Sequence, residues 1–136
     1  MTTPMLTTLL PFAKTLVEFA TKLAGIRASR RKRLAKYCEA IATAITSAHT
    51  ALQAGTAPYE ACARMQGYSE ELPHVAAGMI PQAKISVLVE LLENRLSPED
   101  FLEVYKKPKF RRNLDAELYS AVGMLRAAAD TLIASE

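Results

Sequence analysis

The stretch RASRRKRLAKYCEAIATAITSAHTALQAG, residues 27–55, decides the fold of this 136-residue chain. A block of positive charge leads directly into apolar residues at alternating steps of four and three. These positions are Leu34, Cys38, Ile41, Ile45, Ala48 and Leu52. Such steps keep side chains on one stripe of an α-helix. The stretch therefore predicts an amphipathic helix that ends near Gly55, a residue type common just after helix C-termini.

The same spacing returns near the C-terminus, within residues 110–134. Its apolar positions are Leu114, Leu118, Ala121, Leu125, Ala128 and Leu132. Because each stripe buries what the other exposes, we expect the two helices to pack against each other. The spacing alone leaves open whether they pair within one chain or between two copies.

The rest of the chain also carries helical patterns, and it lacks the alternation typical of strands. We expect helices over residues 3–23, 56–67 and 80–96, and a short one that begins at Ser97 and ends before Pro108. Residues 68–78 contain Pro73 and are expected to form a broken turn and a loop. The segment 80–96 is the most hydrophobic, which indicates a central helix.

These patterns predict an all-α fold, a helical bundle of four main helices plus two short connecting helices. One domain of residues 1–136 is expected, in which residues 1–26 form an amphipathic N-terminal helix and residues 27–136 form the body of the bundle. A hydrophobic content of 50% and a charged content of 23% suit a globular domain rather than a disordered chain.

Cys38 and Cys62 are interpreted as small buried apolar residues in a reducing cytosol, since neither lies in a CxxC motif or beside a histidine. His49 and His74 are equally isolated, so we expect no metal site. The first residues carry no basic region of a secretory signal, which favours a cytoplasmic protein. A peripheral position at the inner face of the cell membrane fits as well.

The N-terminal helix has an apolar arc covering about half of its circumference or more. One explanation is that it is wedged between two neighbouring helices. The other is that its spare face docks on a membrane or a partner. The second explanation names four apolar candidates: Leu10, Phe12, Phe19 and Ile26.

Positive charge gathers in two clusters, although the net charge is only +3. The first cluster consists of Arg27, Arg30, Arg31, Lys32, Arg33 and Lys36. The second cluster consists of Lys106, Lys107, Lys109, Arg111 and Arg112. Both precede or begin a predicted helix, where the helix dipole disfavours cations, so something must offset the unfavourable field.

The clusters allow four interpretations: a solvated face, or a site for anionic lipid, nucleic acid or an acidic protein surface. The N-terminal helix followed at once by the first cluster is the two-signal arrangement of interfacial membrane binding. In the second cluster, Tyr105 and Phe110 alternate with cations, as in RNA-binding surfaces where rings stack on bases. The same two rings also suit core positions.

Nothing in the sequence indicates an enzyme. GxSxG, Gly-rich phosphate-loop and HExxH patterns are absent, and the adjacent acids Glu70 with Glu71 and Glu99 with Asp100 point in different directions on a helix. We therefore expect no catalytic residues, no cofactor and no small-molecule substrate.

Part of the chain resembles a helical module of bacterial, notably cyanobacterial, proteins. The matching positions are Arg31, Arg33, Leu34, Ala35, Tyr37, Ile41, Leu52, Gly55, Pro58, Cys62, Tyr68, Leu72 and Pro73. The order of a hydrophobic N-terminal helix and a helical bundle is also similar to the HeLo and necroptosis-type four-helix domains. That second resemblance implies a bacterial defence effector or adaptor that oligomerises and attacks membranes through its first helix.

The preferred hypothesis is a non-enzymatic protein of an intracellular bacterial system, in the setting of antiviral defence. It would act by self-association and by membrane or partner binding through the N-terminal helix and the first cluster. The first alternative is an RNA-binding or assembly subunit of a ribonucleoprotein complex, such as the small helical subunit of a CRISPR effector. The second alternative is a plain protein–protein adaptor.

Overall fold

The computed structural model describes residues 6–134, which are all-helical and contain no strand. The helices are α1 (Leu9–Ala20), α2 (Ala28–Gln53), α3 (Tyr59–Ala76), α4 (Gln82–Glu93), α5 (Pro98–Lys106) and α6 (Pro108–Ala134). The predicted all-α class is confirmed. The split into four main and two short helices is not confirmed, because α3, expected to be short, has 18 residues and exceeds α1 and α4 with 12 each.

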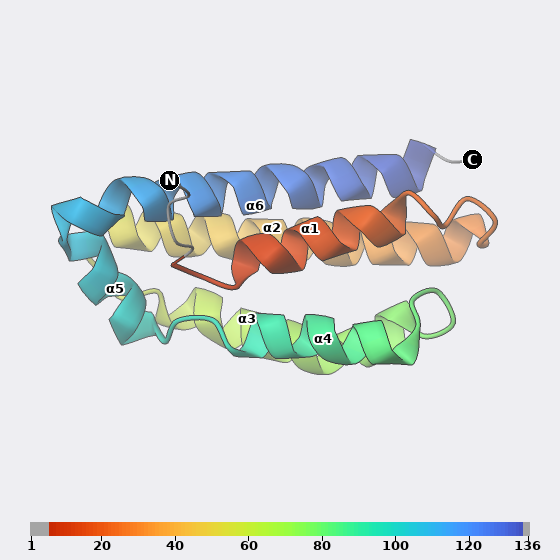
Figure 1. Ribbon diagram of the computed structural model, residues 1–136, viewed down its shortest axis with the longest axis horizontal. Helices are drawn as coiled ribbons and strands as arrows, with labels where there is room; N and C mark the ends of the chain where they lie inside the picture. Colours follow the sequence, from red (N-terminus) through yellow and green to blue (C-terminus); the bar gives the residue numbers. More distant parts are fainter. Residues whose placement is uncertain (1–5, 135–136) are drawn as a thin grey trace.

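Five of the helices close into a ring around one core (Figure 1). α6 packs on both α1 and α2, α3 packs on α2 and α4, and α4 completes the ring against α1. The remaining helix, α5, crosses one end of the bundle, where it contacts α6 and α2. All long helices therefore run along the same axis and shield a shared apolar interior.

The two apolar stripes meet inside this single chain. α2 and α6 share the most extensive packing of any helix pair, and they run antiparallel along the bundle (Figure 1). Every stripe position is buried, from Leu34 to Leu52 on α2 and from Leu114 to Leu132 on α6. The expectation that the two stripes pack together is confirmed, and the structure decides for pairing within the chain.

α1 is wedged between α6 and α4, so most of its apolar arc is core. Phe12 is fully buried, and its assignment to a membrane-binding or partner-binding surface is corrected accordingly. Leu10 and Phe19 lie at the edge of the helix contacts and are half-buried. The predicted helix was also too long: α1 begins at Leu9 and ends at Ala20, and residues 3–5 lie outside the described part of the chain.

α3 runs straight through the predicted break. Gly67 and Pro73 both lie inside it, and the predicted loop at 68–78 is wrong. A glycine and a proline inside a helix cost about 1 and 3 kcal/mol. Burial of the apolar face outweighs this cost; its buried members include Met65, Leu72 and Val75. The helix ends instead before Gly78, which adopts a positive φ of 77°.

α4 is not a central helix, and its sequence is less hydrophobic than that of α1. Only Ile85, Leu88 and Leu92 are buried within it, while Val87 is exposed. The reason is position: α4 contacts α1 and α3 on one side and faces solvent on the other. The prediction of a central helix over residues 80–96 is therefore wrong. Burial depends on how extensively a helix packs on its neighbours, and α4 packs less extensively than α1.

A buried carboxylate anchors the chain just before α1. Glu117 of α6 accepts the backbone N–H groups of Leu6 and Thr7 at 2.6 and 2.9 Å. The Thr7 hydroxyl accepts the N–H of Leu9, and the Thr8 hydroxyl donates to the carbonyl of Leu91 on α4. The start of α1 is thereby tied to both helices between which it is wedged.

Glu117 should make stability depend on pH. Burial raises the pKa of its carboxyl above the ordinary 4.5, although the hydrogen bonds from Leu6 and Thr7 act to lower it. A raised folded pKa means that the contribution of Glu117 is greatest below 4.5 and is lost as pH rises through the raised pKa. The difference in unfolding free energy between wild type and Glu117→Gln should shrink over that rise. Urea unfolding of both proteins at a series of pH values measures it, and a difference that grows with pH would contradict the role of burial.

Candidate functional site

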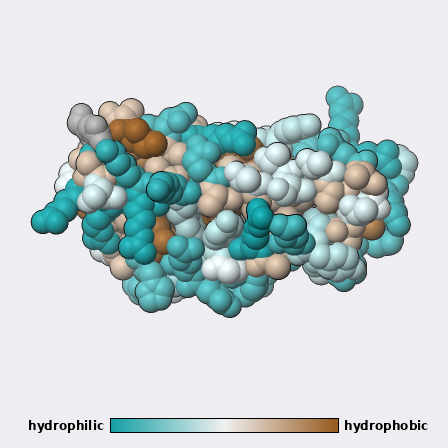
Figure 2. Space-filling model, turned by 180° about the vertical axis from the view of Figure 1, so that it is seen from behind, coloured by the Kyte–Doolittle hydropathy of each residue, from teal (hydrophilic) through white to brown (hydrophobic). Residues whose placement is uncertain are grey.

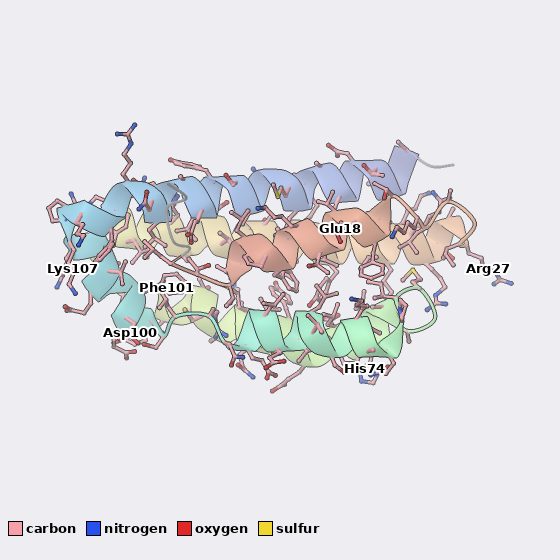
Figure 3. All side chains as sticks on the ribbon, in the orientation of Figure 1. Glu18, Arg27, His74, Asp100, Phe101 and Lys107 are labelled. Atoms are coloured by element: carbon pink, nitrogen blue, oxygen red, sulfur yellow. The ribbon has the colours of Figure 1, made fainter. Side chains whose placement is uncertain are left out.

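The two basic clusters lie at opposite ends of the bundle. Arg27 and Lys107, which mark them, project from the two ends in Figure 3. A helix rises 1.5 Å per residue, so the 26 residues of α2 place the ends about 39 Å apart. The structure therefore does not combine the clusters into one site, and each end has to be considered separately.

In the first cluster, two arginines serve the fold. Arg31 is only 4% exposed, and its guanidinium donates to the carbonyls of Ile26 and Leu132 at 2.9 and 3.0 Å. Arg30 donates to the carbonyl of Ala77, beside Gly78. Leu132 and Ala77 are at the C-terminal ends of α6 and α3, where carbonyl groups lack helical partners.

This arrangement explains why α2 tolerates cations in its first turn. Its N-terminal turn has no acidic residue and no side-chain cap. Antiparallel packing, however, brings the negative C-terminal ends of α3 and α6 next to it. The neighbouring helix ends thus offset the unfavourable field of the α2 dipole on these cations, as the sequence analysis expected. Arg31 is corrected from a surface binding residue to a buried helix cap, while Arg27, Arg33 and Lys36 remain exposed.

The second cluster surrounds the corner between α5 and α6. All five of its cations are exposed, and within residues 6–134 none of them pairs with a carboxylate. Arg111 alone has a clear structural task, because it donates to the carbonyls of Tyr105 and Lys106 at 2.8 and 3.3 Å. The first turn of α6 contains no acid. Uncompensated positive charge is therefore greatest at this corner.

Aromatic rings accompany these cations. The guanidinium of Arg111 lies 5.5 Å from the ring centre of Tyr105, and the ammonium of Lys109 lies 5.4 Å from that of Phe110. Both rings are half-buried. They are thus partly core residues, as one of the two interpretations expected, and partly available at the surface.

A polar network built on the buried His49 lies beside the corner. His49 of α2 shares a 2.6 Å hydrogen bond with Asp115 of α6 and makes an edge contact with the ring of Tyr105. Burial, and then the hydrogen bond to Asp115, raises the pKa of the Tyr105 hydroxyl. Asp115 therefore holds His49, whose ring in turn contacts that of Tyr105.

The description of His49 as isolated was wrong, because its partner is distant in the sequence. Antiparallel packing of α2 and α6 brings His49 beside Asp115. The spacing of the stripes did not identify this pair, because the two residues are 66 positions apart in the chain.

The cysteines and the remaining apolar candidates have simpler surroundings. Cys38 and Cys62 are free buried thiols, as expected, and burial raises the pKa of Cys38 to about 12. Within residues 6–134 no three His, Cys, Asp or Glu side chains converge as metal ligands would. Phe19 and Ile26 are half-buried against the core near the first cluster.

Exposed apolar surface is sparse in residues 6–134. The large exposed hydrophobic residues, none of which belongs to α1, are Tyr59, Val87, Tyr119 and Ile133. On the rear face, hydrophobic side chains gather only in small areas (Figure 2). No helix in residues 6–134 combines the length and apolarity needed to cross a bilayer.

Comparisons of the chain with known protein families, curated proteins and solved structures gave no match. The resemblances to a bacterial helical module and to cell-death domains therefore stay predictions.

Arg31 and Arg33 should separate the structural from the exposed charges of the first cluster. Arg31→Met leaves the carbonyls of Ile26 and Leu132 without their donor, so the unfolding free energy should fall by about 1–3 kcal/mol. Arg33→Met, at an exposed position, should change it by less than about 0.5 kcal/mol. Chemical denaturation measures both, and equal losses would contradict the capping role.

Proposed function

We propose that this chain is a non-enzymatic helical-bundle protein that binds single-stranded nucleic acid at the α5–α6 corner. The main support for this proposal is the second cluster. Its five exposed cations surround the start of α6 and have no carboxylate partner in the described residues. The positive end of the α6 dipole adds to their field. Like charges held this close repel each other, and phosphate groups would relieve that repulsion.

The surroundings favour nucleic acid over a lipid surface at this corner. Membrane binding of a basic surface is marginal without apolar side chains to insert, and Tyr105 and Phe110 are half-buried. Rings at that depth can still present an edge or a face to an unpaired base. An elongated body with the site at one end also suits an assembly subunit, which contacts a strand and leaves its long sides for protein partners.

Charge reversal at the corner should weaken binding strongly. For wild type, the affinity for a fluorescent oligouridylate should fall steeply between about 50 and 200 mM salt, with a log–log slope of about −0.7 per phosphate contacted. Lys107→Glu with Lys109→Glu should reduce affinity by roughly tenfold or more and make that slope shallower by about 1.4. Fluorescence anisotropy measures both quantities.

The matched control is Lys14→Glu with Lys84→Glu, which changes net charge equally at exposed positions of α1 and α4. It should retain most of the affinity. If the two double variants weakened binding equally, the effect would be one of net charge and not of the α5–α6 corner. Absence of binding by wild type at low salt would overturn the proposal.

A second candidate function is peripheral binding to an anionic membrane at the opposite end. It is supported by Phe19 and Ile26, half-buried near the exposed Arg27 and Arg33. The cations supply one signal of interfacial binding, and the two side chains, half-buried like Tyr105 and Phe110, supply a weak apolar one. This retains the self-associating, defence-type hypothesis in a narrower form. It omits Phe12, which is buried, and Leu10, which lies nine residues before Phe19, about 13.5 Å along α1.

Vesicle flotation should test the second candidate. Wild type should float with vesicles containing phosphatidylserine and remain behind with phosphatidylcholine alone. Arg27→Glu with Arg33→Glu should lose the flotation, since each cation near the surface contributes about 1 kcal/mol. Lys107→Glu with Lys109→Glu serves as the control and should float normally. Failure of wild type to float would remove the membrane candidate.

A further inference from the structure

A groove opens beside the second cluster, between the end of α2 and the side of α5. It is open to solvent, has a volume of about 360 Å³, and draws its lining from three helices and the turn after α2. The lining residues are Leu52, Gln53, Gly55, Leu102, Tyr105, Lys106 and Arg111. Its volume lies in the range typical of small-ligand sites.

The lining combines three kinds of surface in one place. Leu52 is buried and Leu102 half-buried, so the floor is apolar. The exposed amide of Gln53 offers both a donor and an acceptor at the rim. Lys106 and Arg111 add positive charge on the side of the cluster. An apolar floor, an amide and flanking cations match the flat base, polar base edge and phosphate of a nucleotide.

Arg111 is prepared as a stacking surface. Two backbone carbonyls, of Tyr105 and Lys106, hold its guanidinium, and the Tyr105 ring lies 5.5 Å away. The ring of His49, held by its hydrogen bond to Asp115, makes an edge contact with that of Tyr105. Since the guanidinium is already ordered, stacking a base on it costs little further side-chain entropy.

We infer that this groove holds one unpaired base of a bound single strand. The base stacks on Arg111 above Leu52 and Leu102, Gln53 hydrogen-bonds its edge, and the adjoining phosphates lie on the cations of the second cluster. Asp115 and His49 act as positioning residues for the wall of the groove. The inference rests on the proposed function and adds a base-binding subsite to it.

The test compares an oligouridylate with an abasic ribose-phosphate oligomer of equal length and charge. Wild type should bind the oligouridylate on the order of tenfold more tightly at the same salt concentration. Arg111→Lys keeps the charge but removes the planar guanidinium, so this ratio should fall toward one while the salt slope stays unchanged. Gln53→Ala, at an exposed position, should weaken only the oligouridylate, by several-fold.

Arg126→Lys, the same exchange farther along α6, should leave the ratio intact, and thermal melting should show all variants folded. Equal affinity of wild type for the two oligomers would overturn the base-binding groove and leave the proposed function standing. A ratio that persists in both Arg111→Lys and Gln53→Ala would place the base elsewhere and likewise overturn it. Binding of neither oligomer would overturn both proposals.

Discussion

α2 and α6 lie antiparallel along the full length of the bundle, with their apolar stripes facing each other. Three contacts between them follow this direction in order: Arg31 with Leu132, Glu39 with Arg126 and His49 with Asp115. Once this pair has formed, α1 can be wedged only where α6 presents an apolar side, and the α3–α4 pair covers the opposite side of α2. The other helices thus occupy places that this one contact defines.

The same antiparallel contact arranges the charges. It sets the N-terminal turn of each long helix beside C-terminal ends of its neighbours, where carbonyl groups lack partners. Arginine side chains donate hydrogen bonds to such carbonyl groups at both ends of the bundle. Arg30 and Arg31 donate to carbonyls of α3 and α6, and Arg111 donates to a carbonyl at the end of α5. A basic cluster at a helix start is therefore partly structural, and only the cations left after this capping are free to bind a ligand.

The two ends of the bundle differ in the cations that remain once those bound to backbone carbonyls are set aside. At the first end, two of six cations are committed to backbone carbonyls, Lys32 is also engaged, and half-buried apolar side chains lie nearby. At the second end, four cations remain without such a commitment. One of them, Lys106, lines a groove together with Arg111, Tyr105 and the amide of Gln53. The α5–α6 corner therefore offers a polyanion more kinds of binding group than the first end does. In the sequence, however, the longer run of arginines is in the first cluster.

Local pattern alone determined the all-helical class, the two long stripes and their mutual burial, because apolar spacing and helix stops act over a few residues. It also located both cation clusters and the cap of α5, where Ser97 accepts the N–H of Asp100. Tertiary structure decided the rest. Packing against other helices keeps α3 helical through Gly67 and Pro73, and it buries Phe12 and Arg31. It also places α4 at the outside of the bundle and brings His49 into contact with Asp115. Each of these depends on which helix lies opposite, and residues far apart in the chain become neighbours only after the helices have packed.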